Sequence, residues 1–227
     1  GGFGAHEQAA GISKVRAANI PMVGWHAGPG AGAMPAEGLF VNVTTDPTEV
    51  AKIAAYYAVA QSDGKAGVVI FTDSLYTVAT AKSDAMAEVI KQCSGCSLLE
   101  VQDTPLAETS TRMPQLTTSL LQRHGDKWNY ALGINDLYFD FIGPSLSRVG
   151  RKPDQPPFSL SAGDGSESAF QRIRKSRYQV ATVPEPLNLH GWQLIDELNR
   201  AFAGEQPSGY VTAVHLVTPQ NVEFDGG

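Results

Sequence analysis

Polar and aromatic side chains follow several short apolar runs of this chain, at points where a predicted strand ends. The pair Asn135 and Asp136 comes directly after the apolar run 130–134. In open α/β sheets, ligands bind outside the carboxyl ends of the strands, so such residues are positioned to contact a small molecule. The residues in these positions are Trp25, His26, Asp46, Asp73, Ser74, Asn135, Asp136, Asp164 and Glu185.

These side chains are carboxylates, amides, imidazole and indole, which hydrogen-bond to and stack on a neutral polyhydroxylated ligand. Each one alone is also explained by turn chemistry, because helix caps and turns favour polar residues at loop starts. Asp136, for example, could be the N-cap of a helix that begins at Leu137. Taken together, at one edge of a sheet, the set predicts a ligand-binding site.

The sequence lacks the motifs of several other chemistries. It has no G-x-S-x-G nucleophile elbow and no GxxxxGK[ST] phosphate loop. Gly163 and Gly165 are not followed by the third glycine of a dinucleotide fingerprint. No spacing of His124, His190 or His215 is typical of a metal site. We therefore expect no catalytic residues, no metal and no cofactor.

Cys93 and Cys96 are the only cysteines of the chain. A zinc site requires further cysteine or histidine ligands, and none follows at a suitable spacing. A thioredoxin-like pair would follow a strand at the start of a helix, but this pair lies between a predicted helix at 79–90 and a strand at 98–101. We predict a small structural disulfide, which fits an oxidising compartment.

Predicted strands alternate with predicted helices along the whole chain. Apolar helical stripes separate the strands, and the segment 26–35 is a predicted Gly/Pro-rich loop. This alternation predicts the α/β class with doubly wound parallel sheets. The predicted strands are 21–25, 39–43, 67–71, 98–101, 130–134, 158–161, 180–183 and 211–217.

Composition is typical of a globular protein, with 42% hydrophobic and 18% charged residues among 227. No apolar run has the length of a membrane span. The net charge of −6 and the absence of a Lys/Arg stripe argue against a nucleic-acid-binding surface.

The order of several short motifs resembles the type I periplasmic binding proteins, in particular the ribose-binding-protein-like sugar-binding subunits of bacterial ABC importers. The resemblance implies two Rossmann-like lobes that are joined by three crossovers and trap a sugar between them. It assigns 1–45 and 187–213 to the N-terminal lobe, and 46–186 and 214–227 to the C-terminal lobe. The N-terminal lobe would lack its first βα units. The motifs are IPMVGW, NVTTDP, GVVIFTD, ALGINDLYFDF, SAGDGS, TVPEPLN and HLVTPQN.

The resemblance also implies roles for individual residues, and four of them depart from the family pattern. His26 stands where the family has an acidic residue, with Trp25 before it. Asp46 replaces an asparagine, and Lys82 falls near the position of a cleft arginine. Glu185 falls near a glutamine of the third hinge. These departures imply a sugar or polyol other than ribose.

Three residues match the family pattern directly. The Asn–Asp pair of the family is kept as Asn135 and Asp136, and the aspartate of its glycine-rich turn is kept as Asp164. A further family contact is lost, because Ala27 stands where the family has an arginine.

The resemblance implies a non-enzymatic, monomeric periplasmic protein that delivers a sugar or polyol to the permease of an ABC importer. One alternative is the effector domain of a LacI-type transcription regulator, which shares the fold. A small α/β enzyme is the third alternative, and it would require a nucleophile next to a base.

Overall fold

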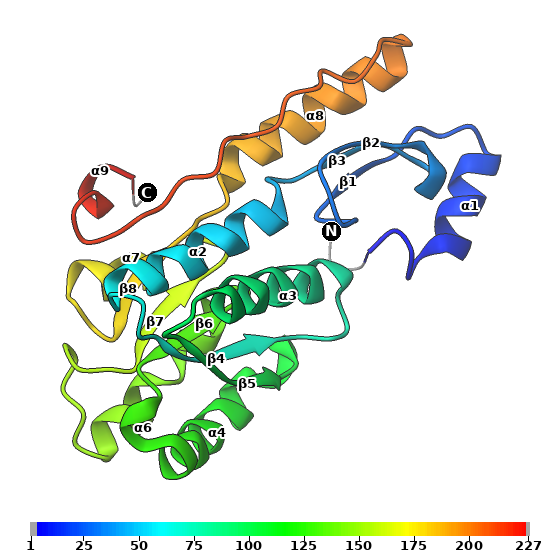
Figure 1. The fold of residues 1–227 in the computed structure, drawn as a ribbon. Helices are drawn as coiled ribbons and strands as arrows, with labels where there is room; N and C mark the ends of the chain where they lie inside the picture. Colours follow the sequence, from blue (N-terminus) through cyan, green and yellow to red (C-terminus); the bar gives the residue numbers. More distant parts are fainter. Residues whose placement is uncertain (1–3, 226–227) are drawn as a thin grey trace. The chain divides into compact units, whose positions relative to one another are not determined.

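The computed structural model describes residues 4–225, which form two compact units (Figure 1). Unit 1 consists of Gly1–Pro47, Tyr76–Val78 and Glu185–Val214. Unit 2 consists of Thr48–Leu75, Ala79–Pro184 and His215–Gly227. Each unit has its own sheet, and each is described by itself.

Unit 2 is built on a five-stranded parallel sheet with the strand order β5-β4-β6-β7-β8. Strands β4 and β6 are buried along their whole length, as expected for central strands covered on both faces. The sheet lies between α2 and α3 on one side and α4 and α6 on the other (Figure 1). The strands are β4 (Gly67–Thr72), β5 (Ser97–Asp103), β6 (Tyr130–Gly133), β7 (Phe158–Ser161) and β8 (Gln179–Thr182).

The helices that follow these strands agree with the sequence patterns in type. Pro47 is the first residue of α2, a position that its fixed φ angle suits. The segment after β6 forms two short helices, α5 and α6, and Pro144 lies in the first turn of the second one, where proline is tolerated. The helices are α2 (Pro47–Gln61), α3 (Thr77–Gln92), α4 (Thr109–His124), α5 (Leu137–Asp140), α6 (Gly143–Arg148), α7 (Glu167–Arg174) and α9 (Val222–Asp225), with 3-10 turns at η2 (Leu106–Glu108) and η3 (Gly125–Lys127).

Unit 1 has a three-stranded sheet in which β1 (Val23–Trp25) pairs in parallel with β3 (Leu39–Val43). The helix α1 (Ala9–Ala17) contributes Ile12 to a small apolar cluster around Ala5, Ala27 and Leu39. The helix α8 (Leu187–Ala203) contacts both β1 and β3. It ends at Gly204 in the left-handed conformation, as its sequence predicts.

Two predictions of local structure were wrong. The predicted loop 26–35 contains β2 (Gly32–Met34), which pairs antiparallel with β3 and leads into η1 (Pro35–Glu37). The predicted strand 211–217 forms only an isolated bridge between Val217 and Thr182. Its residues alternate in burial like those of a strand, but a ladder requires a neighbouring strand over several residues, and β8 meets this segment at one residue only.

The predicted disulfide between Cys93 and Cys96 is present, between α3 and β5. Among residues 4–225, no helix combines the length and the apolar character that crossing a membrane requires.

Candidate functional site

The strand order of unit 2 reverses direction at β4 and β6, because the chain first adds β5 on one side of β4 and then β6, β7 and β8 on the other. In sheets of this kind the crevice at the reversal, outside the carboxyl ends of the strands, is where ligands bind. The segments that leave the carboxyl ends of β4, β6 and β7 carry Asp73, Asn135 and Asp164. The sheet of unit 2 therefore positions three of the polar segments singled out in the sequence.

Asn135 is half-buried at this edge, and its Oδ1 accepts a hydrogen bond from the backbone N–H of Leu137 at 3.1 Å. Asp136 occupies the N-cap position of α5, as the alternative interpretation expected, but its side chain makes no capping hydrogen bond there. Asn135 forms the turn instead, through its Oδ1 atom. Its amide nitrogen, on the other branch of the side chain, takes no part in this hydrogen bond.

Asp136 is 1% exposed and its carboxylate is surrounded by protein donors. Oδ2 accepts from the backbone N–H groups of Gly165 at 2.8 Å and Ser166 at 3.1 Å, and Oδ1 accepts from Gln179 at 2.7 Å. Burial raises the pKa of Asp136, and these three donors oppose that shift. The contacts give Asp136 a structural role, because it ties the end of β6 to the loop that carries Asp164.

Lys82 and Asp164 lie at the same edge of unit 2. The Nζ atom of Lys82, on α3, donates to the carbonyl oxygen of Ala162 at 2.7 Å, directly after β7. Asp164 is half-buried and has a positive φ of 65°, between Gly163 at 139° and Gly165 at 76°. Aspartate tolerates the left-handed region better than most residues. This turn presents the side chain of Asp164 at the end of β7.

Trp25 and His26 are at the carboxyl end of β1 in unit 1. His26 has a φ of 49°, which turns the chain sharply as the strand ends. The buried Asn42 of β3 holds the following loop, since its Oδ1 accepts from the N–H of Ala27 at 2.9 Å and its Nδ2 donates to Gly30. The rings of Trp25 and His26 contact each other, with centroids 4.3 Å apart.

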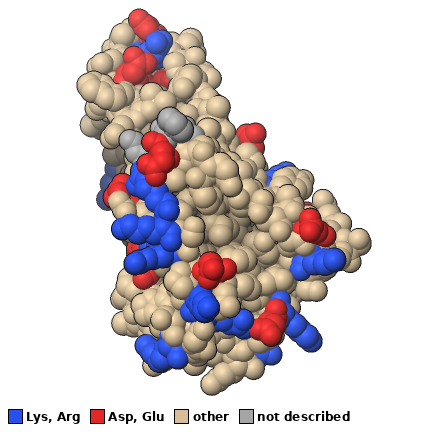
Figure 2. All heavy atoms as spheres, turned by 90° about the vertical axis from the view of Figure 1, so that its left-hand side faces the viewer, with Lys and Arg blue, Asp and Glu red and all other residues tan. Residues whose placement is uncertain are grey.

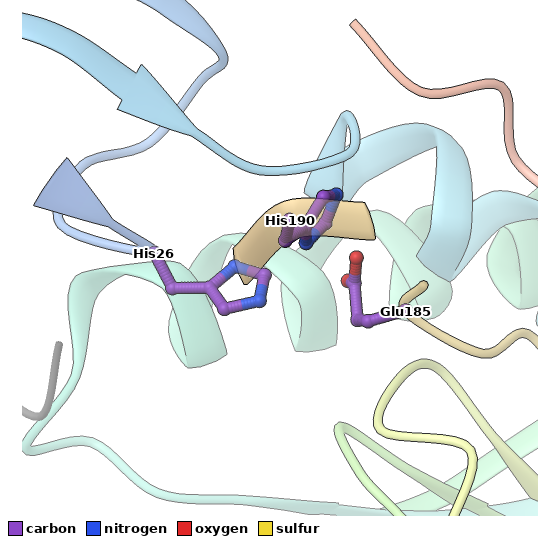
Figure 3. A group of neighbouring side chains, drawn as sticks. All are labelled: His26, Glu185 and His190. Carbon is purple, nitrogen blue, oxygen red and sulfur yellow. The ribbon is translucent and has the colours of Figure 1, made fainter. Parts of the chain in front are cut away.

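Glu185 lies next to His26 in unit 1, together with His190 (Figure 3). Glu185 comes directly before Pro186, the N-cap of α8, and His190 is the fourth residue of that helix. The indole Nε1 of Trp25 donates to Nδ1 of His190 at 3.3 Å. Burial lowers the pKa of His190, although the negative charge of Glu185 opposes the shift. The end of β1 and the start of α8 thus form one polar cluster.

Asp46 is exposed and directly precedes α2. Of the predicted residues, the structure groups Trp25, His26 and Glu185 in unit 1, and groups Asn135, Asp136, Asp164 and Lys82 at the strand ends of unit 2.

The family model described as "Periplasmic binding protein domain" matches residues 5–206 of the chain. The chain belongs to the periplasmic binding protein family. The resemblance read from the sequence motifs and the predicted α/β fold class are both confirmed.

Solved structures of sugar-binding proteins share the fold of this periplasmic binding protein. GanP, a glucose-galactose binding protein from Geobacillus stearothermophilus, is 18% identical with a TM-score of 0.83, over 97% of this chain and 75% of that chain. An ABC transporter solute binding protein from Bacillus halodurans C-125 with bound myo-inositol is 16% identical with a TM-score of 0.82, over 97% and 73%.

A third structure, an ABC transporter solute binding protein from Agrobacterium vitis with bound allitol, is 18% identical with a TM-score of 0.78, over 95% and 73% of the two chains. At these identities the likeness establishes the fold alone. A search of curated proteins found no match.

His190 joins Trp25, His26 and Glu185 in the unit 1 cluster, and the sequence patterns did not single it out as a candidate site residue. Its separation from Trp25 is 165 residues, so no local spacing connects the two. The sequence places His190 near the start of an amphipathic helix, and its burial to 1% exposure is seen in the structure alone.

Proposed function

We propose that this periplasmic binding protein binds a sugar or polyol and delivers it to the permease of a bacterial ABC importer. The observation that carries the proposal is the carboxyl edge of the unit 2 sheet, where Asn135, Asp164 and Lys82 lie around the reversal of strand order. Family membership supports a binding role, and the solved structures that share the fold are described as a glucose-galactose binding protein and as solute binding proteins with bound myo-inositol and bound allitol.

Each unit by itself carries side chains that suit a neutral, hydroxyl-rich ligand. In unit 2, the amide of Asn135 and the carboxylate of Asp164 provide both donors and acceptors for hydroxyl groups. In unit 1, the half-buried indole of Trp25 offers an apolar face for a sugar ring, and His26 offers a polar group beside it. Asp46, which is exposed before α2, is a further proposed contact.

We propose a periplasmic location, a monomeric state and a binding role without catalysis. The disulfide between Cys93 and Cys96 supports an oxidising compartment. Figure 2 shows one face on which basic and acidic side chains are interspersed, and ion pairs such as Arg172–Asp140 and Arg174–Glu167 mix the two signs in unit 2. Mixed charge supports the expectation that nucleic acid is not a partner.

A thermal-shift screen of the ligand-free chain against sugars and polyols tests the proposal. A ligand that binds only the folded state raises the melting temperature, by an amount equivalent to about 2.7 kcal/mol at 100-fold excess over Kd. We expect one compound to raise it while close epimers do not. No shift across the panel in folded protein would contradict the proposal.

Two variants connect the binding to unit 2. Asn135→Ala and Asp164→Asn should each weaken the affinity for the compound found in the screen by at least about tenfold. Asn135→Ala removes a hydrogen bond to the ligand, and Asp164→Asn removes the negative charge of an acceptor. Asp154→Asn is the matched control, because Asp154 is exposed in unit 2 before β7, at the opposite end of the strands. Equal affinity in all three would remove this edge from the site.

A further inference from the structure

Three side chains with metal-ligating atoms converge in unit 1: His26, Glu185 and His190 (Figure 3). One ligand atom from each lies within 4.8 Å of the ligand atoms of the other two. Glu185 is 5% exposed and His190 is 1% exposed. His26 beside them is half-buried. Burial of a carboxylate and an imidazole side by side is unusual, because each of these groups loses hydration when it is buried.

Two threonines directly after β3 form hydrogen bonds with two members of this cluster. Thr44 Oγ1 lies 2.7 Å from Nδ1 of His26, and Thr45 Oγ1 donates to Oε2 of Glu185 at 2.6 Å. In protein metal sites, the second nitrogen of a ligating histidine and the second oxygen of a ligating carboxylate are held in this way, which orients the first atom towards the metal. The arrangement assigns Nε2 of His26 and Oε1 of Glu185 as the ligand atoms.

His190 supplies an independent observation. Its Nε2 atom is fully buried and has no hydrogen-bond partner among the described residues. A buried polar group without a partner costs about 1–3 kcal/mol, so native structures usually provide one. A metal ion bound by Nε2 would satisfy this nitrogen.

We propose that His26, Glu185 and His190 bind a divalent transition-metal ion, with Zn²⁺ as the best match. Imidazole nitrogens together with one carboxylate favour Zn²⁺ over Mg²⁺ and Ca²⁺, which prefer oxygen ligands. Three protein ligands leave a fourth tetrahedral position for water or a solute oxygen. His26 is shared with the proposed sugar site, but binding of the metal ion does not require the sugar ligand.

Metal binding requires two local adjustments. Tetrahedral coordination at Zn²⁺ bond lengths places ligand atoms about 3.3 Å apart, so the three side chains must move inward. The indole of Trp25 can only donate, so its contact uses the lone pair of Nδ1 and leaves the proton of neutral His190 on Nε2. When Nε2 binds the metal, the proton moves to Nδ1 and the contact with Trp25 opens. The fluorescence of Trp25 should therefore change on metal binding.

Titration of the chelator-treated chain with ZnCl₂ tests the proposal by calorimetry and tryptophan fluorescence. We expect saturable binding of one Zn²⁺ per chain, and no binding of Mg²⁺. His190→Gln and Glu185→Gln should weaken the affinity at least about tenfold, because changes around a metal site cost 10–100-fold even when they spare the ligands. His6→Gln is the matched control, since His6 is exposed in unit 1 outside the cluster.

A further variant tests the proposal without removing a metal ligand. Trp25→Phe keeps the three ligands and an aromatic ring but removes the N–H that competes for His190, so it should bind Zn²⁺ at least as tightly as the wild type. Circular dichroism verifies that each variant is folded. The proposal is overturned by absence of saturable binding in the wild type, by equal affinity in His190→Gln, or by equal losses in the His6→Gln control.

Discussion

Gln179 donates its side-chain amide to the buried carboxylate of Asp136 at 2.7 Å. The orientation of that amide is fixed, because Oε1 of Gln179 accepts from the guanidinium of Arg172 at 2.8 Å. Asp136 thus connects β8 with the loop after β7, while itself following β6. Three neighbouring segments at the carboxyl edge of the sheet depend on one carboxylate.

Replacing Asp136 by asparagine should destabilise unit 2 by about 1–3 kcal/mol. If the new amide oxygen keeps the bonds from Gly165 and Ser166, the new NH₂ group faces the donor of Gln179, which cannot rotate without losing Arg172. Urea unfolding measures the difference, with Asp154→Asn as a control for loss of one carboxylate. Equal midpoints in the two variants would show that the network contributes nothing.

Glu100 contributes to the pH dependence of the free energy of unfolding in the acidic range. The hydrogen bond from Arg123 is the main cause that lowers the pKa of Glu100 to about 2, and His124 adds to it. Because the folded-state pKa lies below the unfolded one, the stabilisation is present above about pH 4.5 and is lost as the pH falls towards 2. Both partners are partly exposed, so its size is less than about 1 kcal/mol.

Glu100→Gln should therefore lower the free energy of unfolding slightly at pH 7 and leave it unchanged near pH 2. Urea unfolding of variant and wild type at several pH values measures the difference. Asp84→Asn, on the exposed face of α3, is the control. A difference that stays constant down to pH 2 would mean that the ion pair is not its origin.

The disulfide between Cys93 and Cys96 should stabilise the chain only modestly. It closes a loop of sequence separation 3, and the loop-entropy relation gives at most about 2 kcal/mol for so short a loop. Denatured chain without reductant should show no reactive thiol, and Cys93→Ser/Cys96→Ser should unfold at a slightly lower urea concentration. A loss well above this limit would point to native contacts of the sulfur atoms.

Gly67, the first residue of β4, has no room for a side chain. A Cβ atom there would lie 1.8 Å from the carbonyl oxygen of Lys127, a backbone atom that cannot move independently. Gly67→Ala should destabilise the chain by about 1–3 kcal/mol or more through overpacking. Gly191→Ala is the control with the opposite sign, because Gly191 has open space on α8 and alanine favours a helix by up to about 1 kcal/mol. Equal unfolding midpoints would contradict the clash.

The amino-acid sequence by itself determined the fold class, most strands and helices of unit 2, and the Cys93–Cys96 disulfide. These features depend on local patterns: a continuous apolar run for a buried strand such as β4, a helical stripe, or two cysteines three residues apart. The sequence also identified polar strand ends, because in a parallel sheet these positions follow directly from the order of elements.

Only the tertiary structure decided which polar residues meet and what each one does. The segment 211–217 has the pattern of a strand, but pairing requires a neighbour that the pattern does not contain. Asp136 and Asn135 have similar sequence contexts, yet one is enclosed by donors and the other forms a turn. The contact between Thr45 and Glu185 spans 140 residues, and the one between Trp25 and His190 spans 165. Such contacts arise when distant strand and helix ends pack together, and the spacing of residues along the chain carries no record of them.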